Sequence, residues 1–243
     1  MPVIESPSLL ASITKSTRRA RHLPALLRRL PVFDDPLRFA RYEVSEVPRA
    51  LPHRLRGSGL IVYVRHHTAD IGMLNAGFVE DAYRFPAPVW DRLTSLRHPP
   101  RVLDAGAKVG MFGLYVLERF PDARILALEP DPLNAVILRR CIRANGRLDE
   151  WLVDDSAAPD ALELLPHHDL AKLSLEDEEW RILEDERLAA IDVPLLFVEG
   201  PAAREPDPAA IQRRRELLRA AGFSGLWSGP RGPGHGVSWA WRN

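Results

Sequence analysis

The chain has 243 residues, of which 46% are hydrophobic, and it can therefore bury one sizeable core. The formal net charge is zero, so nothing in the overall charge points to a nucleic-acid partner. A single cysteine excludes an intrachain disulfide, and with no bilayer-length apolar run and no signal-peptide pattern we expect a cytoplasmic protein without a membrane span.

The first 57 residues differ from the rest in charge and in proline content. Residues 1–57 carry 11 Lys and Arg against 5 Asp and Glu. Apolar residues at helical spacing predict one or two short helices over 8–30 and a further turn of helix over 33–42. A basic arm for RNA or a membrane surface is the alternative, but the segment lacks interleaved aromatic residues. We predict an N-terminal extension or cap over 1–57 and one α/β domain over 58–243.

The next segment predicts a strand followed by a helix. Alternation over Leu60–Arg65 is typical of a strand, and Thr68 is suited to cap a helix that runs to Phe78. His66 and His67 are neighbours at the strand end, so their side chains should point to opposite faces. Because no carboxylate pair lies nearby in the sequence, we expect both to be surface residues, and we predict no metal site.

The most informative stretch, residues 101–146, has the layout of a βαβα unit. Its elements are a strand ending at 103, the turn 104–110 (DAGAKVG), a helix over 111–120, a buried strand over 124–129 and a helix over 133–144. Gly106 permits a tight turn and the close approach of a ligand, and Gly110 permits the helix to pack on its strand. The helix N-terminus offers unpaired N–H groups to the same crevice.

The residues around the turn favour a particular cofactor. Glu129 follows the second strand, where a carboxylate can accept hydrogen bonds from both hydroxyls of a ribose, so a nucleoside-bearing cofactor is indicated. The spacing from Asp104 to Gly110 is not G-x-G-x-x-G, and Asp104 suits the ammonium group of S-adenosylmethionine (SAM). A nicotinamide-dependent oxidoreductase is disfavoured because no Tyr-x-x-x-Lys follows. A glycine turn without any ligand is the remaining alternative.

The stretch resembles the FkbM-like branch of class I SAM-dependent methyltransferases. VLDAGAKVG is similar to the first motif of that family, and ALEPDPLNAVILRRCIRANG is similar to its second strand and helix. Arg65, Thr68, Asp70 and Tyr83 fit positions that precede the first glycine motif. The resemblance implies SAM as the cofactor, bound by Asp104, Gly106, Ala107, Lys108, Gly110, Glu129 and Pro130.

After Gly146 the sequence departs from the family pattern. A class I methyltransferase normally supplies here a third strand, a fourth with an acidic residue on the adenine side and then a fifth strand, each separated by a helix. Only 22 residues lie between Gly146 and Asp169. They can hold a short strand at 151–153, an exposed acidic turn at 154–155 and a short helix around 158–165. We therefore expect the third or fourth strand to be missing or vestigial, and the adenine side of the crevice to be open.

The segment over 169–183 is similar to the family pattern D-L-L-K-x-D-I-E-G-A-E-x-x-x-L. The matching residues are Asp169, Lys172, Glu176, Glu179 and Leu183. The family aspartate is Ser174 here and the family glycine is Asp177, and a serine is not a general base at neutral pH without help. The candidate bases are Glu176, Glu179 and His168. Of the two glutamates, we expect Glu176 to face the acceptor and Glu179 to be structural.

The end of the chain completes an α/β pattern, with a buried strand over 194–199, a helix over 207–221 and an antiparallel pair of strands at 226–227 and 237–241. The predicted fold is a Rossmann-like class I methyltransferase sheet, mostly parallel, with a C-terminal antiparallel hairpin and an N-terminal helical extension.

The predicted function is SAM-dependent methyl transfer to a hydroxyl group of a small metabolite or sugar. The alternative is a degenerate methyltransferase that binds SAM or a protein partner without turnover, for which the shortened 147–168 region and the residues Ser174 and Asp177 argue. The identity of the acceptor and the choice between a monomer, a homodimer and a complex stay open.

Overall fold

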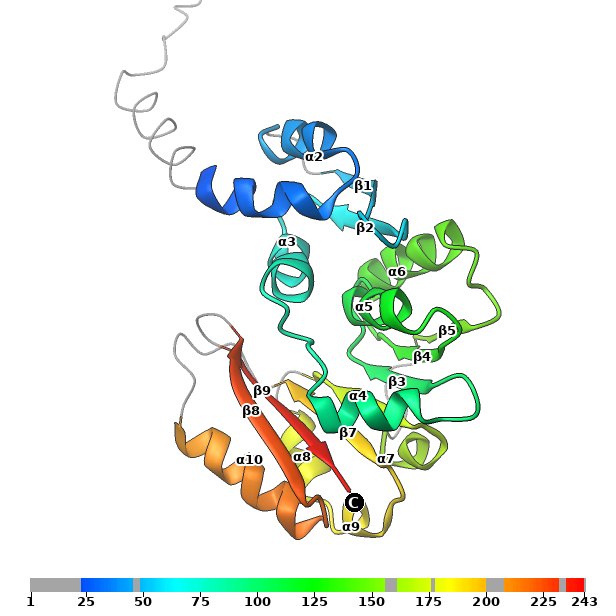
Figure 1. The fold of residues 1–243 in the computed structure, drawn as a ribbon, viewed down its shortest axis with the longest axis vertical. Helices are drawn as coiled ribbons and strands as arrows, with labels where there is room; N and C mark the ends of the chain where they lie inside the picture. Colours follow the sequence, from blue (N-terminus) through cyan, green and yellow to red (C-terminus); the bar gives the residue numbers. More distant parts are fainter. Residues whose placement is uncertain are drawn as a thin grey trace, which may run out of the picture.

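A seven-stranded sheet forms the centre of the protein (Figure 1). The computed structural model describes residues 23–45, 49–155, 161–175, 178–199, 208–231 and 235–242. The strand order is β5-β4-β3-β6-β7-β9-β8, in which the first five strands are parallel and β9 is antiparallel to both of its neighbours. The strands are β3 (Arg101–Ala105), β4 (Arg124–Leu128), β5 (Trp151–Asp154), β6 (Leu170–Leu173), β7 (Leu195–Glu199), β8 (Gly225–Arg231) and β9 (His235–Trp241). This arrangement confirms the predicted fold class.

Helices cover both faces of the sheet. One face carries α4 (Ala87–Thr94), α5 (Met111–Arg119) and α6 (Pro132–Ala144). The other carries α7 (Ala161–Leu164), the short η3 (Leu165–His167), α8 (Glu178–Glu184), α9 (Arg187–Ala190) and α10 (Pro208–Ala220). Successive residues of a strand point to opposite faces, so Val102 lies in one apolar cluster and Leu103 in the other, both fully buried. Burial on both faces explains why these strands read as continuous apolar runs.

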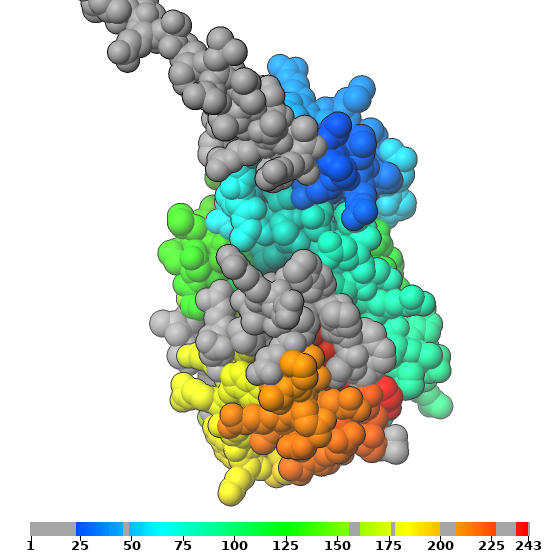
Figure 2. All heavy atoms as spheres, turned by 90° about the vertical axis from the view of Figure 1, so that its left-hand side faces the viewer, coloured from blue at the N-terminus to red at the C-terminus, as the bar shows by residue number. Residues whose placement is uncertain are grey.

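The N-terminal elements gather at one end of the molecule, as Figures 1 and 2 both show, with α10 towards the other end. They are a helix over residues 23–29, η1 (Leu30–Val32), α2 (Pro36–Glu43), the antiparallel strands β1 (Ala50–Arg54) and β2 (Ile61–Arg65), α3 (Ala69–Leu74) and the π-helix η2 (Asn75–Val79). Thr68 caps α3, as predicted. The predicted boundary between residues 57 and 58 falls in the turn between β1 and β2 and stays a prediction. We use the name N-terminal extension below for the described residues from 23 to 79, the end of η2.

The hairpin of β1 and β2 is fastened to α6. The Asn145 side chain at the end of α6 accepts a hydrogen bond from Ile61 N at 2.8 Å and donates one to Ile61 O at 2.7 Å. The thiol of Cys141 also donates to Ile61 O, at 3.2 Å. Burial raises the pKa of Cys141 to about 12. The extension therefore packs directly on a helix of the sheet domain.

The expectation that the third or fourth strand is missing was wrong. β5 pairs with β4 from Trp151 opposite Ile125, and β6 pairs with β3 from Leu170 opposite Val102. Both strands have four residues, and α7 and η3 between them span only residues 161–167. Short elements thus fit a complete strand order into the shortened region, although residues 156–160 lie outside the described part.

The expectation that His66 is a surface residue was also wrong. His66 is fully buried, with its Nε2 3.0 Å from His53 Nε2 and its Nδ1 2.9 Å from Glu43 Oε2. Glu43 in turn pairs with Arg29 at 3.0 Å. The pKa of His53 is lowered to about 4, mainly by burial and then by the neighbouring His66. His67 is exposed, so only one of the two neighbouring histidines faces solvent.

No helix in the described part of the chain is both long and apolar enough to cross a bilayer.

Candidate functional site

The turn between β3 and α5 lies at the carboxyl edge of the parallel strands. Three of its residues have left-handed backbone angles, with φ of 75° at Gly106, 53° at Lys108 and 89° at Gly110. The N–H groups of Gly106 and Ala107 both donate to Leu128 O at 3.0 Å, which ties the turn to the end of β4. A lysine in this conformation costs about 1–2 kcal/mol, and such strain is typical of functional sites.

The two glycines of the turn are required by close packing inside the protein. A β-carbon on Gly106 would lie 1.9 Å from Ser174 O, and Ser174 N donates to Ala105 O at 3.1 Å. A β-carbon on Gly110 would lie 2.7 Å from Leu138 of α6. The close neighbour of Gly106 is therefore the end of β6, where a ligand was expected, and Gly110 brings α5 close to α6. Ser174 consequently lies directly beside the turn.

Asp104 and Lys172 form a buried ion pair beneath the turn. Asp104 is fully buried and Lys172 is 3% exposed, with Lys172 Nζ 2.8 Å from Asp104 Oδ1. The same ammonium group donates to Gly106 O at 3.0 Å. Asp104 Oδ2 accepts no hydrogen bond from the described residues. The pair thus holds the glycine turn against β6 and leaves Asp104 Oδ2 buried without a described donor. Lys172 was matched in the sequence pattern, but nothing there assigned it this role.

Glu129 is brought to the turn, at the carboxyl end of β4. It is 5% exposed, and its Oε2 accepts a hydrogen bond from Lys108 N at 2.6 Å. Its Oε1 accepts from Asp131 N at 3.0 Å and from Asn134 Nδ2 at 3.2 Å. A carboxylate has about four acceptor positions, so these three described donors leave about one, on Oε2. Pro130, beside Glu129, is exposed.

Arg65 of the N-terminal extension is connected to Glu129 through the side chain of Asn134 in α6. Arg65 forms a two-pronged pair with Asp70, with distances of 2.9 Å from Nε to Oδ2 and 2.8 Å from Nη2 to Oδ1. Arg65 Nη2 also donates to Asn134 Oδ1 at 2.6 Å. Sequence reasoning grouped Arg65 with Asp70 by resemblance, but it did not reveal that both are connected to Glu129.

Two of the three candidate bases have defined positions. Glu179 lies in the first turn of α8 and is fully buried. Burial lowers the pKa of Arg214 in α10, and the charge of Glu179 offsets part of that effect. This interior position next to α10 fits the structural role predicted for Glu179. Glu176 lies outside the described residues, as does Asp177.

His168, the other candidate base in the described part, lies away from the glycine turn. It precedes β6, and its Nδ1–H donates to Leu164 O at 2.7 Å. The glycine turn lies at the carboxyl end of the parallel strands, whereas His168 lies at their amino end. The length of β6 therefore separates His168 from Gly106.

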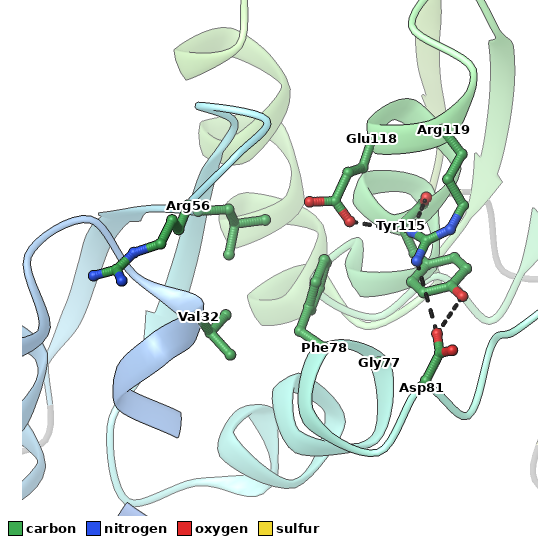
Figure 3. Close-up of a pocket in the computed structure, with 9 residues that line it drawn as sticks. Val32, Arg56, Gly77, Phe78, Asp81, Tyr115, Glu118 and Arg119 are labelled. Atoms are coloured by element: carbon green, nitrogen blue, oxygen red, sulfur yellow. Dashed lines mark hydrogen bonds and ion pairs between the residues drawn. The ribbon is translucent and has the colours of Figure 1, made fainter. Parts of the chain in front are cut away.

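A cavity of about 290 Å³ lies at a different place, between the extension and the second half of α5 (Figure 3). Val32 and Phe78 contribute to its apolar wall. Three of its polar groups interact with one another, since Tyr115 Oη donates to Asp81 Oδ1 at 2.5 Å and the Arg119 guanidinium lies 3.4 Å above the Tyr115 ring. Figure 3 shows these groups converging on one side of the cavity. We regard the cavity as part of the junction between extension and domain.

Within the described ranges, no group of three or more His, Cys, Asp or Glu side chains is arranged to hold a metal ion.

Comparison with known proteins identifies the fold. No protein-family model matches the chain. Among solved structures, that of P. horikoshii TYW2 in complex with MeSAdo superposes with a TM-score of 0.50 and 14% identity, covering 82% of this chain and 74% of that one. At this level of identity the similarity concerns the fold alone.

Local sequence similarity connects the chain to methyltransferases. Methyltransferase sdnD of Sordaria araneosa is 39% identical over 56 residues, and the type II methyltransferase M.XamI of Xanthomonas campestris pv. amaranthicola is 41% identical over 74 residues. The matches span 23% and 28% of this chain, but only 22% and 14% of those two proteins. Sequence similarity to methyltransferases is thus present over about a quarter of this chain. The resemblance to the FkbM-like branch is not tested by these matches and stays a prediction.

Proposed function

We propose that the chain is a SAM-dependent methyltransferase of the FkbM-like type that methylates a hydroxyl group of a small metabolite or sugar. The observation that carries this proposal is the Glu129 carboxylate, buried at the end of β4 and bonded to Lys108 N in the glycine turn. A carboxylate at this edge of a parallel sheet is well suited to accept a hydrogen bond from a ribose hydroxyl, and Oε2 has a position left for one.

The remaining residues of the turn fit the methionine half of SAM. Asp104 Oδ2 is buried without a described donor, so it can accept a hydrogen bond from the ammonium group. No described side chain caps the N-terminus of α5 at Gly110, so its N–H groups can receive the methionine carboxylate. SAM would supply the methyl group on its sulfonium. The work of the protein is then to orient the two reactants and to exclude water.

The acceptor is expected over the ends of β6 and β7. Ser174 follows β6 beside Gly106, and Glu199, 8% exposed, ends β7. The hydroxyl of Ser174 can bind the acceptor hydroxyl, but it is a poor general base. Glu176 therefore stays our proposed base.

A second candidate function is a SAM-binding protein without methyltransferase activity. It is favoured by Ser174, which stands where the FkbM-like pattern has an aspartate. A missing strand no longer argues for it, because β5 and β6 are both present. The distinction is whether bound SAM is turned over.

The experiment uses the full-length chain with isotopically labelled SAM and a panel of hydroxylated metabolites and sugars. Thermal-shift measurements with SAM, with its demethylated product SAH and with NAD run in parallel. We expect SAM and SAH to raise the melting temperature, NAD to leave it unchanged, and one acceptor class to gain label. A shift with NAD alone would contradict the proposal, and a shift with SAM but no labelling of any acceptor would favour the second candidate.

A further inference from the structure

The N-terminal extension and the Glu129 carboxylate are joined by a continuous line of side-chain hydrogen bonds. The line starts at Asp70 of α3, passes through Arg65 at the end of β2 and Asn134 of α6, and ends at Glu129. The residues come from four separate elements, and Arg65 and Asn134 are 69 positions apart in the sequence. Nothing in the proposed function described above uses Arg65, Asp70 or Asn134.

Asp70 holds the Arg65 guanidinium group in one orientation. The Asp70 side chain is fully buried, and it accepts hydrogen bonds from Arg65 N at 2.9 Å, from Nε at 2.9 Å and from Nη2 at 2.8 Å. A two-pronged bond of this kind fixes the plane of the guanidinium group. Hydrogen bonding to Asp70 is the main cause of a raised Arg65 pKa, so the group stays charged.

The second part of the line orients an amide. Arg65 Nη2 carries only hydrogens, so the Asn134 atom 2.6 Å from it must be the acceptor, Oδ1. This contact fixes the rotation of the amide group and directs Nδ2 towards Glu129 Oε1, at 3.2 Å. Without Arg65, only the bond to Glu129 itself would orient the Asn134 amide, so the donor would be held less firmly.

We propose that Arg65 and Asn134 are positioning residues that hold the Glu129 carboxylate in the orientation that receives the ribose of the cofactor. The N-terminal extension thereby takes part in cofactor binding through a defined contact and is more than an appended cap. This inference rests on the proposed function, because it assumes that Glu129 binds a nucleoside.

A simpler role for the same bonds is to fasten the hairpin to α6. The structure offers a matched control for that role, because Asn145 also ties β2 to α6, with two hydrogen bonds to Ile61, but makes no contact with Glu129. A residue that only fastens the hairpin should behave like Asn145.

The test measures the dissociation constant of SAH by calorimetry, together with the melting temperature, for the full-length chain and its variants. Asn134 is half-exposed in the first turns of α6, and alanine is a good helix former, so Asn134→Ala should fold. We expect Asn134→Ala to weaken SAH binding about tenfold, because the carboxylate loses one of its three donors and its orientation. Asn145→Ala should lower the melting temperature and leave the dissociation constant within about twofold.

A double-mutant cycle separates positioning through Glu129 from any other effect of Asn134. In the background of Glu129→Ala, the change Asn134→Ala should have no further effect on the dissociation constant, because the group it positions is gone. Arg65→Lys, which keeps a cation beside Asp70 but loses the planar fork, should weaken binding about as much as Asn134→Ala.

Each outcome is decisive. If the wild type does not bind SAH, the proposed function itself fails. If the wild type binds and Asn134→Ala binds equally well, the proposed function stands and the positioning role is wrong. Equal weakening by Asn145→Ala, or an undiminished effect of Asn134→Ala in the Glu129→Ala background, also overturns the positioning role.

Discussion

Replacing Lys172 by methionine is the sharpest test of how the glycine turn is held in place. The side chain of Lys172 is almost fully buried, and its ammonium group bonds both Asp104 Oδ1 at 2.8 Å and Gly106 O at 3.0 Å. Methionine keeps an unbranched chain of similar length but removes the charge. Asp104 would then be a fully buried carboxylate without its cation.

The expected cost is large compared with the stability of an ordinary domain. Removing one partner of a buried ion pair costs about 3–5 kcal/mol, against a total of about 5–15 kcal/mol for folding. Replacing both partners by apolar residues is often close to neutral. We therefore expect Lys172→Met to lose about 3–5 kcal/mol, and the double variant Lys172→Met/Asp104→Val to recover most of that loss.

Urea unfolding followed by tryptophan fluorescence measures both values, because the chain has 6 tryptophans and Trp151 is buried beside Gly110. The double variant keeps the test informative if the single variant fails to fold. A loss below about 1 kcal/mol for Lys172→Met, or a double variant no more stable than the single one, would refute the view that this ion pair secures the turn.

Three further predictions concern other parts of the molecule. Lys108→Gly should stabilise the chain by about 0.5 kcal/mol in urea unfolding. It relieves the left-handed strain of the lysine, about 1–2 kcal/mol, but adds the entropy cost of ordering a glycine, about 0.5–1 kcal/mol. Lys108→Ala keeps the strain and should gain nothing. The folded pKa of His53, about 4, lies below the ordinary value of about 6.5, so the unfolded chain binds more protons and the contribution of His53 is complete above pH 6.5. That contribution, about 3 kcal/mol, is lost as the pH falls from 6.5 to 4. The free energy of unfolding of the wild type should therefore decrease over this window, and His53→Gln should lack that part of the decrease. A flat wild-type profile would contradict this. Cys141 is buried with its pKa raised to about 12, so the native chain should resist iodoacetamide at pH 8 and label fully in urea, and fast native labelling would show that the hairpin opens.

The sequence predicted the cofactor side of the fold well because its signals are local. The helices predicted over 111–120 and 133–144 are α5 and α6, which span Met111–Arg119 and Pro132–Ala144. The glycine turn and Glu129 follow two neighbouring parallel strands, β3 and β4, so both lie at the same edge of the sheet. The sequence pattern was therefore enough to predict that they lie close together.

The strand count failed for a physical reason. The prediction assumed strands and helices of ordinary length, and 22 residues then seemed too few for the region 147–168. In its described part, that region holds one strand of four residues, β5, and one helix of four residues, α7, and β6 follows directly at Leu170. Short elements of the kind predicted there are enough to complete the sheet.

Contacts between distant segments were beyond the reach of the sequence. The partners of buried His66 are His53 and Glu43 of α2, and no sequence pattern in the hairpin predicts these contacts. The link from Arg65 to Glu129 likewise exists only once β2 packs on α6. Polar networks of this kind arise from tertiary packing, and a single sequence carries no signal for them.

Calorimetric titration of SAH into the wild-type chain and into Glu129→Ala tests the central claim most directly. We expect the wild type to bind with micromolar affinity, about −8 kcal/mol. Glu129→Ala should weaken binding by about 1–3 kcal/mol, since the buried carboxylate at the end of β4 no longer accepts hydrogen bonds from the ribose. Binding of equal strength in the variant, or no heat at all with the wild type, would contradict the assignment of this edge of the sheet as a SAM site.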